Sequence, residues 1–261
     1  IVELATKFLL CGTLVAKLPY EKVNTVRTKN RRLGLGLMGM HEWLVKRGQK
    51  YEVTEELHKW LSVYKGVSDN TSSKLADNLN ISRPVANRAI APTGSIGILA
   101  GTTTGIEPLF AAAYKRRYLK NGRWHYQYVV DGVAKEMIEH YGANPTTLDT
   151  SMSLAADAKR RIAFQADVQD YVDMSISSTI NLPKWGTETN TEDKVEHFTH
   201  LLAEYAHRLR GFTCYPDGSR GGQPLVSVNY TDAVKKLGEE FEEHVEVVDI
   251  CDITGGGTCG A

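Results

Sequence analysis

A run of glycine and hydroxyl residues in the middle of the chain has the chemistry of a phosphate-binding loop. It begins Ala91-Pro92-Thr93-Gly94-Ser95-Ile96-Gly97 and continues three residues later as Gly101-Thr102-Thr103-Thr104-Gly105. Glycine lets backbone N–H groups approach an anion closely, and Ser and Thr add hydroxyl donors. A strand that leads into such a loop and a helix N-terminus can cradle a phosphate. The candidate site is therefore Pro92, Thr93, Gly94, Ser95, Ile96 and Gly97, with an ordinary surface loop as the alternative.

Two cysteines near the end of the chain could carry reducing equivalents. Cys251 and Cys259 flank the triple glycine Gly255-Gly256-Gly257. Closing a loop over so few residues costs little entropy, so the two thiols can meet and undergo thiol–disulfide exchange. Half of a zinc site is the alternative, although the tight Cys-x-x-Cys spacing is absent. Cys11 and Cys214 lie in apolar patterns and are expected to be inert core cysteines.

A third pattern, Gly34-Leu35-Gly36-Leu37-Met38-Gly39, matches the dinucleotide fingerprint and leaves open a nicotinamide-dependent oxidoreductase. That fingerprint must follow a buried strand, whereas residues 27–32 are polar or basic. We therefore favour a structural role, in which Gly34, Gly36 and Gly39 lie in a short strand and turn between closely packed backbones. No metal site is predicted, because His41-Glu42 lacks the second histidine of a zinc-protease helix.

Basic and aromatic residues are interleaved over 111–130, around the Asn121-Gly122 turn of a predicted hairpin. Such a surface could make the chain a nucleic-acid-binding module, by stacking on bases and by charge. The same pattern suits a two-stranded ribbon with aromatic residues on the packed face and cations outward. We favour the ribbon, because the chain as a whole has no basic excess, and nucleic acid is not an expected partner.

Helices and short apolar strands alternate along the rest of the chain. Helices are predicted over 3–17, with Leu4, Phe8, Cys11 and Val15 on one apolar face, over 54–65, with Thr54 as the N-cap, and over 131–141, 164–176 and 191–210. Strands are predicted near 33–38, 87–92, 178–182 and 212–215. The order of strand, helix and strand favours parallel βα units. From about residue 239 the chain becomes acidic and then glycine-rich, which predicts a mobile tail.

Composition narrows the class of protein. The 261 residues carry 31 basic and 31 acidic side chains, and 42% are hydrophobic, which is ordinary for a globular protein. No apolar run could span a bilayer and no signal segment is recognised, so no membrane contact is expected. Four cysteines do not make a disulfide scaffold, which favours a cytoplasmic location. Because Ile1 already lies in a helical pattern, we expect one piece of a longer polypeptide.

Four of these motifs, in this order, resemble the C-terminal half of the catalytic subunit of ribonucleotide reductase. Residues 30–39 resemble a barrel strand and turn, 91–108 the substrate-phosphate loop, 179–183 a later strand, and 211–220 the last strand. The adenosylcobalamin-dependent class is the most similar. The oxygen-dependent class has two adjacent tyrosines where this chain has only Tyr215, and an acidic residue in the loop.

The resemblance implies an α/β fold, the second half of a ten-stranded barrel over residues 1–240, with a flexible cysteine-bearing tail over 241–261. It implies reduction of ribonucleotides to 2′-deoxyribonucleotides by thiyl-radical chemistry, with adenosylcobalamin as cofactor and the substrate phosphates at 92–97. The radical-bearing cysteine is then expected upstream, on the N-terminal portion of the same enzyme, which becomes a partner. Cys251 and Cys259 would reduce an active-site disulfide after each turnover, and a thioredoxin- or glutaredoxin-like protein would reduce them in turn.

Overall fold

The computed structural model describes residues 1–121, 123–219 and 225–242. Gly122 of the hairpin turn and both tail cysteines, Cys251 and Cys259, lie outside these residues. The described chain forms two compact units, each assembled from separate stretches of sequence. The first unit comprises 1–107, 159–179 and 198–213, and the second comprises the described residues of 108–158, 180–197 and 214–242.

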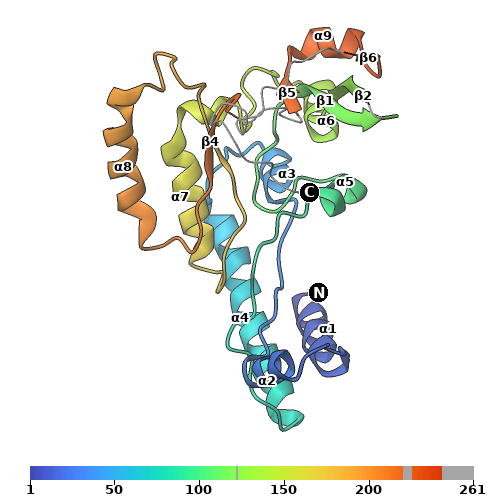
Figure 1. Cartoon of the computed structure of the whole chain (residues 1–261), viewed down its shortest axis with the longest axis vertical. Coiled ribbons are helices and arrows are strands. Elements are labelled where there is room, and N and C mark those ends of the chain that lie inside the picture. The colour runs from blue at the N-terminus through green and yellow to red at the C-terminus, as the bar shows by residue number, and fades with distance from the viewer. Residues whose placement is uncertain (122, 220–224, 243–261) are drawn as a thin grey trace, which may run out of the picture. The chain divides into compact units, whose positions relative to one another are not determined.

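Helices and strands are labelled in Figure 1. The helices are α1 (Val2–Val15), α2 (Glu21–Asn30), α3 (Met40–Val45), α4 (Glu55–Asn78), α5 (Gly94–Ala100), α6 (Gly132–Tyr141), α7 (Ala158–Gln169), α8 (Glu192–Ala206) and α9 (Tyr230–Lys235), with a short 3-10 helix η1 (Ser153–Ala156). The strands are β1 (Ala113–Lys120), β2 (Arg123–Val130), β3 (Ile180–Leu182), β4 (Cys214–Pro216), β5 (Leu225–Ser227) and β6 (Glu240–Glu242). Among the described residues, no helix combines the length and the apolar character needed to cross a lipid bilayer.

The first unit is organised around a central extended segment, residues 87–92, which has a parallel neighbour on each edge. Leu35 bridges to Arg88 on one edge, and Ile90 bridges to Ile176 on the other. The Leu35 N–H donates to the Asn87 carbonyl (3.0 Å), and the Ser177 N–H donates to the Ile90 carbonyl (2.8 Å). Because both edges are hydrogen-bonded, the direction in which the chain leaves this segment at Pro92 is well defined.

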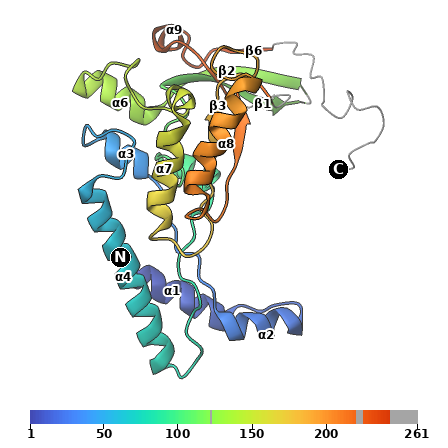
Figure 2. The same ribbon diagram turned by 90° about the vertical axis from the view of Figure 1, so that its left-hand side faces the viewer.

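Helix α4 packs against α1 in the first unit (Figure 2). Thr54 is its N-cap, as its position in the sequence predicts, and its hydroxyl accepts from the Leu57 N–H (3.3 Å). The helix continues well past the predicted end at residue 65, because small buried residues extend its packed face as far as Ala76. Ala76 forms a buried cluster with Leu10 of α1 and Leu33.

The packed face of α1 differs from the predicted one, and the expectation that Cys11 is a core cysteine is wrong. Thr6 and Leu10 are the buried residues of this helix, and their face meets α4. Cys11 is exposed, as are Leu4 and Phe8 of the predicted apolar stripe. The helix carries apolar residues on two faces, and periodicity alone does not indicate which of them packs within this chain.

The second unit contains the predicted hairpin, which is confirmed in full register from Ala113 opposite Val130 to Lys120 opposite Arg123. Its sheet has the order β5-β1-β2-β6, and Figure 1 shows α9 beside the hairpin. Strands β3 and β4 pair in parallel, with Ile180 opposite Cys214. Cys214 is half-buried, and this burial raises the pKa of its thiol.

The four predicted strand positions are all extended and paired in parallel. The helix predicted over 164–176 is displaced, because α7 ends at Gln169 and the chain turns before it reaches Ile176. Gln169 supports this turn by donating from its side-chain amide to the carbonyls of Val172 (2.7 Å) and Met174 (2.9 Å). Helix α2 lacks a hydrophobic period and no buried residue anchors it, so the sequence analysis did not find it.

Candidate phosphate-binding site

The predicted phosphate loop joins the central extended segment to α5. Thr93 is the N-cap of α5 and has a left-handed backbone conformation, with φ 49° and ψ 27°. This conformation costs a non-glycine residue about 1–2 kcal/mol. Two hydrogen bonds hold it in place, because the Thr93 hydroxyl accepts from the Gly105 N–H (2.8 Å) and the Thr93 carbonyl accepts from the Gly97 N–H (2.7 Å). A strained residue that its surroundings hold so firmly is typical of a ligand-binding turn.

The surface of this turn carries no charged side chain. Pro92, Gly94, Ser95 and Ile96 are exposed, Thr93 is half-buried, and Gly97 is buried. A Cβ added at Gly94 would meet nothing within 4 Å, so a ligand can come close to the backbone there. The first N–H groups of a helix have no acceptor within the helix, which leaves them available for an anion.

The second half of the glycine–threonine run supports the loop from behind. The Thr102 N–H donates to the Gly97 carbonyl (3.0 Å). A Cβ added at Gly97 would lie 2.7 Å from the Thr104 methyl carbon, so only glycine allows this approach. Gly105 has φ +48° and donates to Thr93. The two halves of the run therefore form one structural element, which the sequence analysis treated as a single motif.

A buried arginine secures the end of this element to the neighbouring extended segment. Arg161 of α7 is 2% exposed and donates to the Glu107 carboxylate (2.6 Å) and to the Thr179 carbonyl (2.7 Å). The other Glu107 oxygen accepts from the Thr179 N–H (2.5 Å). Tyr51 donates to the Ile106 carbonyl (2.5 Å) and accepts from Arg161, and burial raises the pKa of its phenol. Paired in this way, Arg161 and Glu107 act on the shape of the loop rather than on a ligand.

The glycine pattern at 34–39 has the structural role that we favoured over a dinucleotide site. A Cβ at Gly36 would lie 2.7 Å from the Ala89 carbonyl oxygen, so glycine permits the close contact between these two segments. Gly39 has φ +77° and is the N-cap of α3. Helix α2, rather than a strand, precedes the pattern, which departs from the fingerprint's required context.

The cations of the hairpin mostly contact partners within its own sheet. Arg117 stacks on Trp124 at 4.0 Å from the ring centroid. Lys120 pairs with Glu240 (2.8 Å), an interaction that raises the pKa of the lysine and lowers that of Glu240. This is the arrangement expected of the structural ribbon, with β6 covering one edge.

At the opposite, amino end of the parallel segments, charged side chains are abundant and paired. Arg88 is 1% exposed and donates to Asp69 (2.5 Å) and Asp173 (2.7 Å). The second Asp173 oxygen accepts the N–H groups of Asn87 (2.8 Å) and Arg88 (3.0 Å). The sequence signal for this network is an arginine inside a buried strand pattern, and the motifs considered above did not include it.

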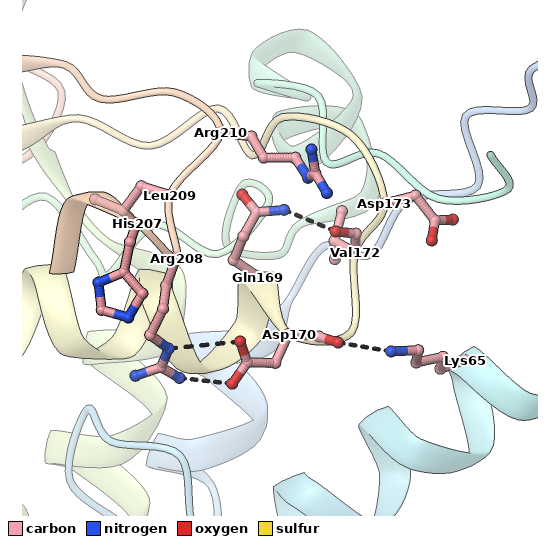
Figure 3. A pocket seen from close by; sticks show the side chains of 9 residues that line it. All are labelled: Lys65, Gln169, Asp170, Val172, Asp173, His207, Arg208, Leu209 and Arg210. Atoms are coloured by element: carbon pink, nitrogen blue, oxygen red, sulfur yellow. Dashed lines mark hydrogen bonds and ion pairs between the residues drawn. The ribbon is translucent and has the colours of Figure 1, made fainter. Parts of the chain in front are cut away.

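A polar pocket of about 390 Å³ lies at this amino end, with Asp173 in its wall. Figure 3 shows Arg208 facing Asp170, to which it donates at 2.6 Å, and Lys65 reaching the Asp170 carbonyl (2.9 Å). Arg208 also donates to Asp167 (2.7 Å). The pocket lining therefore has much of its charge satisfied internally. Among the described residues, including those of this pocket, no three His, Cys, Asp or Glu side chains gather as metal ligands would.

Comparison with known families identifies the fold that carries this loop. Residues 1–80 and 82–215 match the family model of the ribonucleotide reductase barrel domain. The chain belongs to this family. The match covers the phosphate loop, the glycine pattern at 34–39, strand β3 and β4 as far as Tyr215, and it ends before the predicted redox tail.

Curated relatives support the same family. The chain is 26% identical over 276 residues to a vitamin B12-dependent ribonucleoside-diphosphate reductase of Mycobacterium tuberculosis, covering 92% of this chain and 39% of the relative. It is 27% identical over 281 residues to the protein of the same name from Thermoplasma acidophilum, covering 94% and 35%. An adenosylcobalamin-dependent ribonucleoside-triphosphate reductase of Euglena gracilis is 22% identical over 89% of this chain and 33% of its own length. The chain therefore spans between a third and two fifths of these relatives.

Solved structures show the reductase fold. A crystal structure of a B12-dependent (class II) ribonucleotide reductase matches 91% of this chain and 37% of its own, with a TM-score of 0.71 and 15% identity. The α subunit of a class Id ribonucleotide reductase from Actinobacillus ureae matches 83% of this chain and 46% of its own, with a TM-score of 0.61. The predicted α/β barrel architecture is confirmed by this likeness together with the family match.

Proposed function

We propose that this chain is the part of a ribonucleotide reductase that holds the substrate phosphates, at Pro92–Gly97. The observation that carries the proposal is the loop itself, which is exposed, uncharged, free of side-chain obstruction at Gly94 and held in a left-handed turn at Thr93. Its backbone N–H groups and the Ser95 hydroxyl suit phosphate oxygens. Because no charged side chain lies between Arg88 and Glu107, binding here depends on backbone geometry.

In the proposed reaction, a ribonucleotide becomes a 2′-deoxyribonucleotide. The bond between C2′ and its hydroxyl oxygen breaks, the oxygen leaves as water, and two active-site thiols supply two electrons and become a disulfide. A thiyl radical on the N-terminal portion of the enzyme starts the chemistry. That portion is the proposed partner of this chain, which spans 39% of the Mycobacterium tuberculosis relative. The loop's contribution is to hold the phosphates so that the ribose lies in a fixed position.

We propose that Cys251 and Cys259 reduce that disulfide by thiol–disulfide exchange. Two tail thiols become one tail disulfide, and two active-site thiols are restored. A thioredoxin- or glutaredoxin-like protein then supplies the next two electrons. Support comes from the pairing of two cysteines around a triple glycine in the sequence, since both cysteines lie outside the described residues.

Adenosylcobalamin is the proposed source of the radical, because the relatives are named for it. Two pockets of the described residues, of about 390 and 370 Å³, are lined mainly by charged and polar side chains. Neither offers the broad apolar surface that a corrin ring and its adenosyl group require. These pockets therefore do not fit the cofactor, and none of their residues is assigned a role in its chemistry.

Gly94→Val in the reconstituted enzyme tests the phosphate site. A valine there blocks the approach to the backbone, and losing one charge-assisted contact should cost about 1.5–3 kcal/mol, or about 10- to 150-fold in nucleotide affinity by titration calorimetry. The matched control is Gly132→Val, because Gly132 is also the exposed first residue of a helix with open space around it. Unchanged affinity in Gly94→Val would remove the loop from the site.

Replacing both Cys251 and Cys259 with Ser tests the tail. A pre-reduced enzyme should complete one turnover, whereas multiple turnover driven by a thioredoxin-like protein should be abolished. A small dithiol that enters the active site directly should restore turnover. Full thioredoxin-driven turnover in the double variant would show that the tail is not the shuttle, and loss of a bound zinc ion together with the fold would favour the zinc alternative.

A further inference from the structure

The start of α3 and the segment behind the phosphate loop are joined by a set of side-chain contacts that neither the family match nor the loop motif predicts. Glu42, in the first turn of α3, is 19% exposed at its side chain. One of its carboxylate oxygens accepts a short hydrogen bond from the Thr102 hydroxyl. The other pairs with Lys46 (2.9 Å), the C-cap residue of the same helix.

Thr103 strengthens the same junction through its hydroxyl and its backbone. Its hydroxyl oxygen accepts from the Glu42 N–H (3.3 Å). Its carbonyl accepts from the Gly39 N–H (2.7 Å). Thr103 is 7% exposed, so these bonds are largely protected from water.

Gly39 is what makes room for the Thr102 hydroxyl. A Cβ at position 39 would lie 2.6 Å from the Thr102 hydroxyl oxygen, and the residue has φ +77°. The glycine thus has a specific geometric role, because any side chain here would displace the group that donates to Glu42.

From Thr102 the connection reaches the phosphate loop in one step. The Thr102 N–H donates to the carbonyl of Gly97, the last residue of the loop, at 3.0 Å. Gly97 in turn donates to the carbonyl of Thr93, the strained residue at the loop's start (2.7 Å). A carboxylate on α3 is therefore linked to the residue that shapes the phosphate site by three hydrogen bonds, one between side chains and two between backbone groups.

We propose that Glu42 is a positioning residue for nucleotide binding. It holds the Thr102 hydroxyl in place, and Thr102 in turn fixes the position of the phosphate loop at Gly97. The proposal rests on the proposed phosphate function of Pro92–Gly97. No direct contact with the phosphates is assigned to Glu42, because a carboxylate beside them would repel them. The Lys46 ammonium offsets the charge of the Glu42 carboxylate, and the Thr102 hydroxyl donates a hydrogen bond to it.

Steady-state kinetics of the reconstituted enzyme test this role. Glu42→Ala removes the acceptor, and Thr102→Val removes the donor while keeping the branched shape. Each should raise the KM for the nucleotide about five- to tenfold and change kcat less than about twofold. Because both variants break the same hydrogen bond, the double variant should have a KM no higher than that of either single variant. Competition by a nucleoside without phosphates should be unaffected.

Conservative variants separate positioning from general damage. Glu42→Gln and Thr102→Ser keep an acceptor and a donor, and both should retain a KM within about twofold of the parent. Lys46→Gln is the matched control on the same helix, because it removes the ion pair and leaves the Thr102 bond intact. If Glu42→Ala fails to fold, the Thr102→Val and Thr102→Ser pair answers the same question.

The outcomes distinguish this inference from the proposed function. If Gly94→Val weakens nucleotide binding but Glu42→Ala and Thr102→Val leave the KM unchanged, the positioning role is wrong and the phosphate site stands. If all three leave it unchanged, the phosphate site itself is wrong. Equal losses for phosphorylated and unphosphorylated competitors would also overturn the positioning role, because a general change in the fold would then explain them.

Discussion

The two ends of the parallel segments in the first unit differ in their charged side chains. At the amino end, Arg88, Asp69 and Asp173 are tightly paired, and Arg208 is bonded to two more carboxylates. At the carboxyl end, the chain from Ala89 to Ile106 carries no charge, and its loop presents backbone to the surface. In α/β barrels, charge satisfied internally at the amino end contributes to stability, whereas ligand sites form at the carboxyl end. The charged groups of the amino end are already paired with one another, so the uncharged loop at the carboxyl end is the better candidate for an anion site.

The largest expected effect is on stability, at the amino end. Arg88→Met leaves two carboxylates without their buried partner. We expect the free energy of unfolding to fall by about 3 kcal/mol, the lower end of the range for buried pairs, because Asp69 and Asp173 are partly exposed. Denaturant unfolding of the chain measures it. Arg208→Gln is the control from the same amino end, and its more exposed pairs should be worth less than about 1 kcal/mol. Equal losses would show that burial does not separate the two arginines.

A smaller effect on stability is expected when two glycines are compared, one beside the central segment and one in the loop. Gly36→Ala would press against the Ala89 carbonyl oxygen at 2.7 Å, and we expect a loss of about 2 kcal/mol in unfolding free energy. Gly94→Ala meets open space, so its stability should change by less than about 0.5 kcal/mol. Thermal unfolding of the two variants side by side checks this, and a destabilised Gly94→Ala would mean that the loop is packed rather than open.

The smallest effect concerns two buried phenols, and it depends on pH. Burial raises the pKa of Tyr64, which donates to the Leu35 carbonyl (2.6 Å), and burial likewise raises that of Tyr51 beside the loop. A raised folded-state pKa means that the stabilisation is complete below the ordinary phenol value of about 10 and is lost as the pH rises above it. Tyr64→Phe should cost about 1 kcal/mol at neutral pH and reduce the alkaline loss.

Ultraviolet absorbance of phenolate follows this prediction directly. Exposed tyrosines should ionise near their ordinary pKa, whereas Tyr51 and Tyr64 should ionise only as the chain unfolds at alkaline pH. Ionisation of all tyrosines in one step before unfolding would contradict the burial of these two side chains.

Much of the local structure was predictable, because neighbouring residues decide it. The hairpin followed from Asn121-Gly122 between alternating residues, and the N-cap of α4 followed from Thr54. The four strand positions followed from short apolar runs, and the parallel pairing from their alternation with helices. The phosphate loop was recognisable from glycine and hydroxyl residues alone, and it stays a prediction until nucleotide binding is measured.

The incorrect predictions share one cause. In each case the local sequence is compatible with two arrangements of the chain, and contacts with distant residues select one of them. Cys11 belongs to one of two apolar faces of α1, and contact with α4 selects the other. Helix α7 ends at Gln169, before the predicted residue 176, because bonds from the Gln169 side chain and the parallel bridge at Ile176 favour a turn and strand there. These outcomes depend on partners far along the chain, which a local pattern does not contain.

The sequence by itself determined which segments of this protein are extended, where the chain must turn, and which short run has the donors for a phosphate. Which polar and charged side chains contact one another was decided by the tertiary structure alone. Glu42 meets Thr102 across 60 residues, and Arg88 meets Asp173 across 85. The physical reason is that backbone preferences act over a few neighbouring residues, whereas a buried ion pair or a shared hydroxyl exists only after distant segments have been packed together.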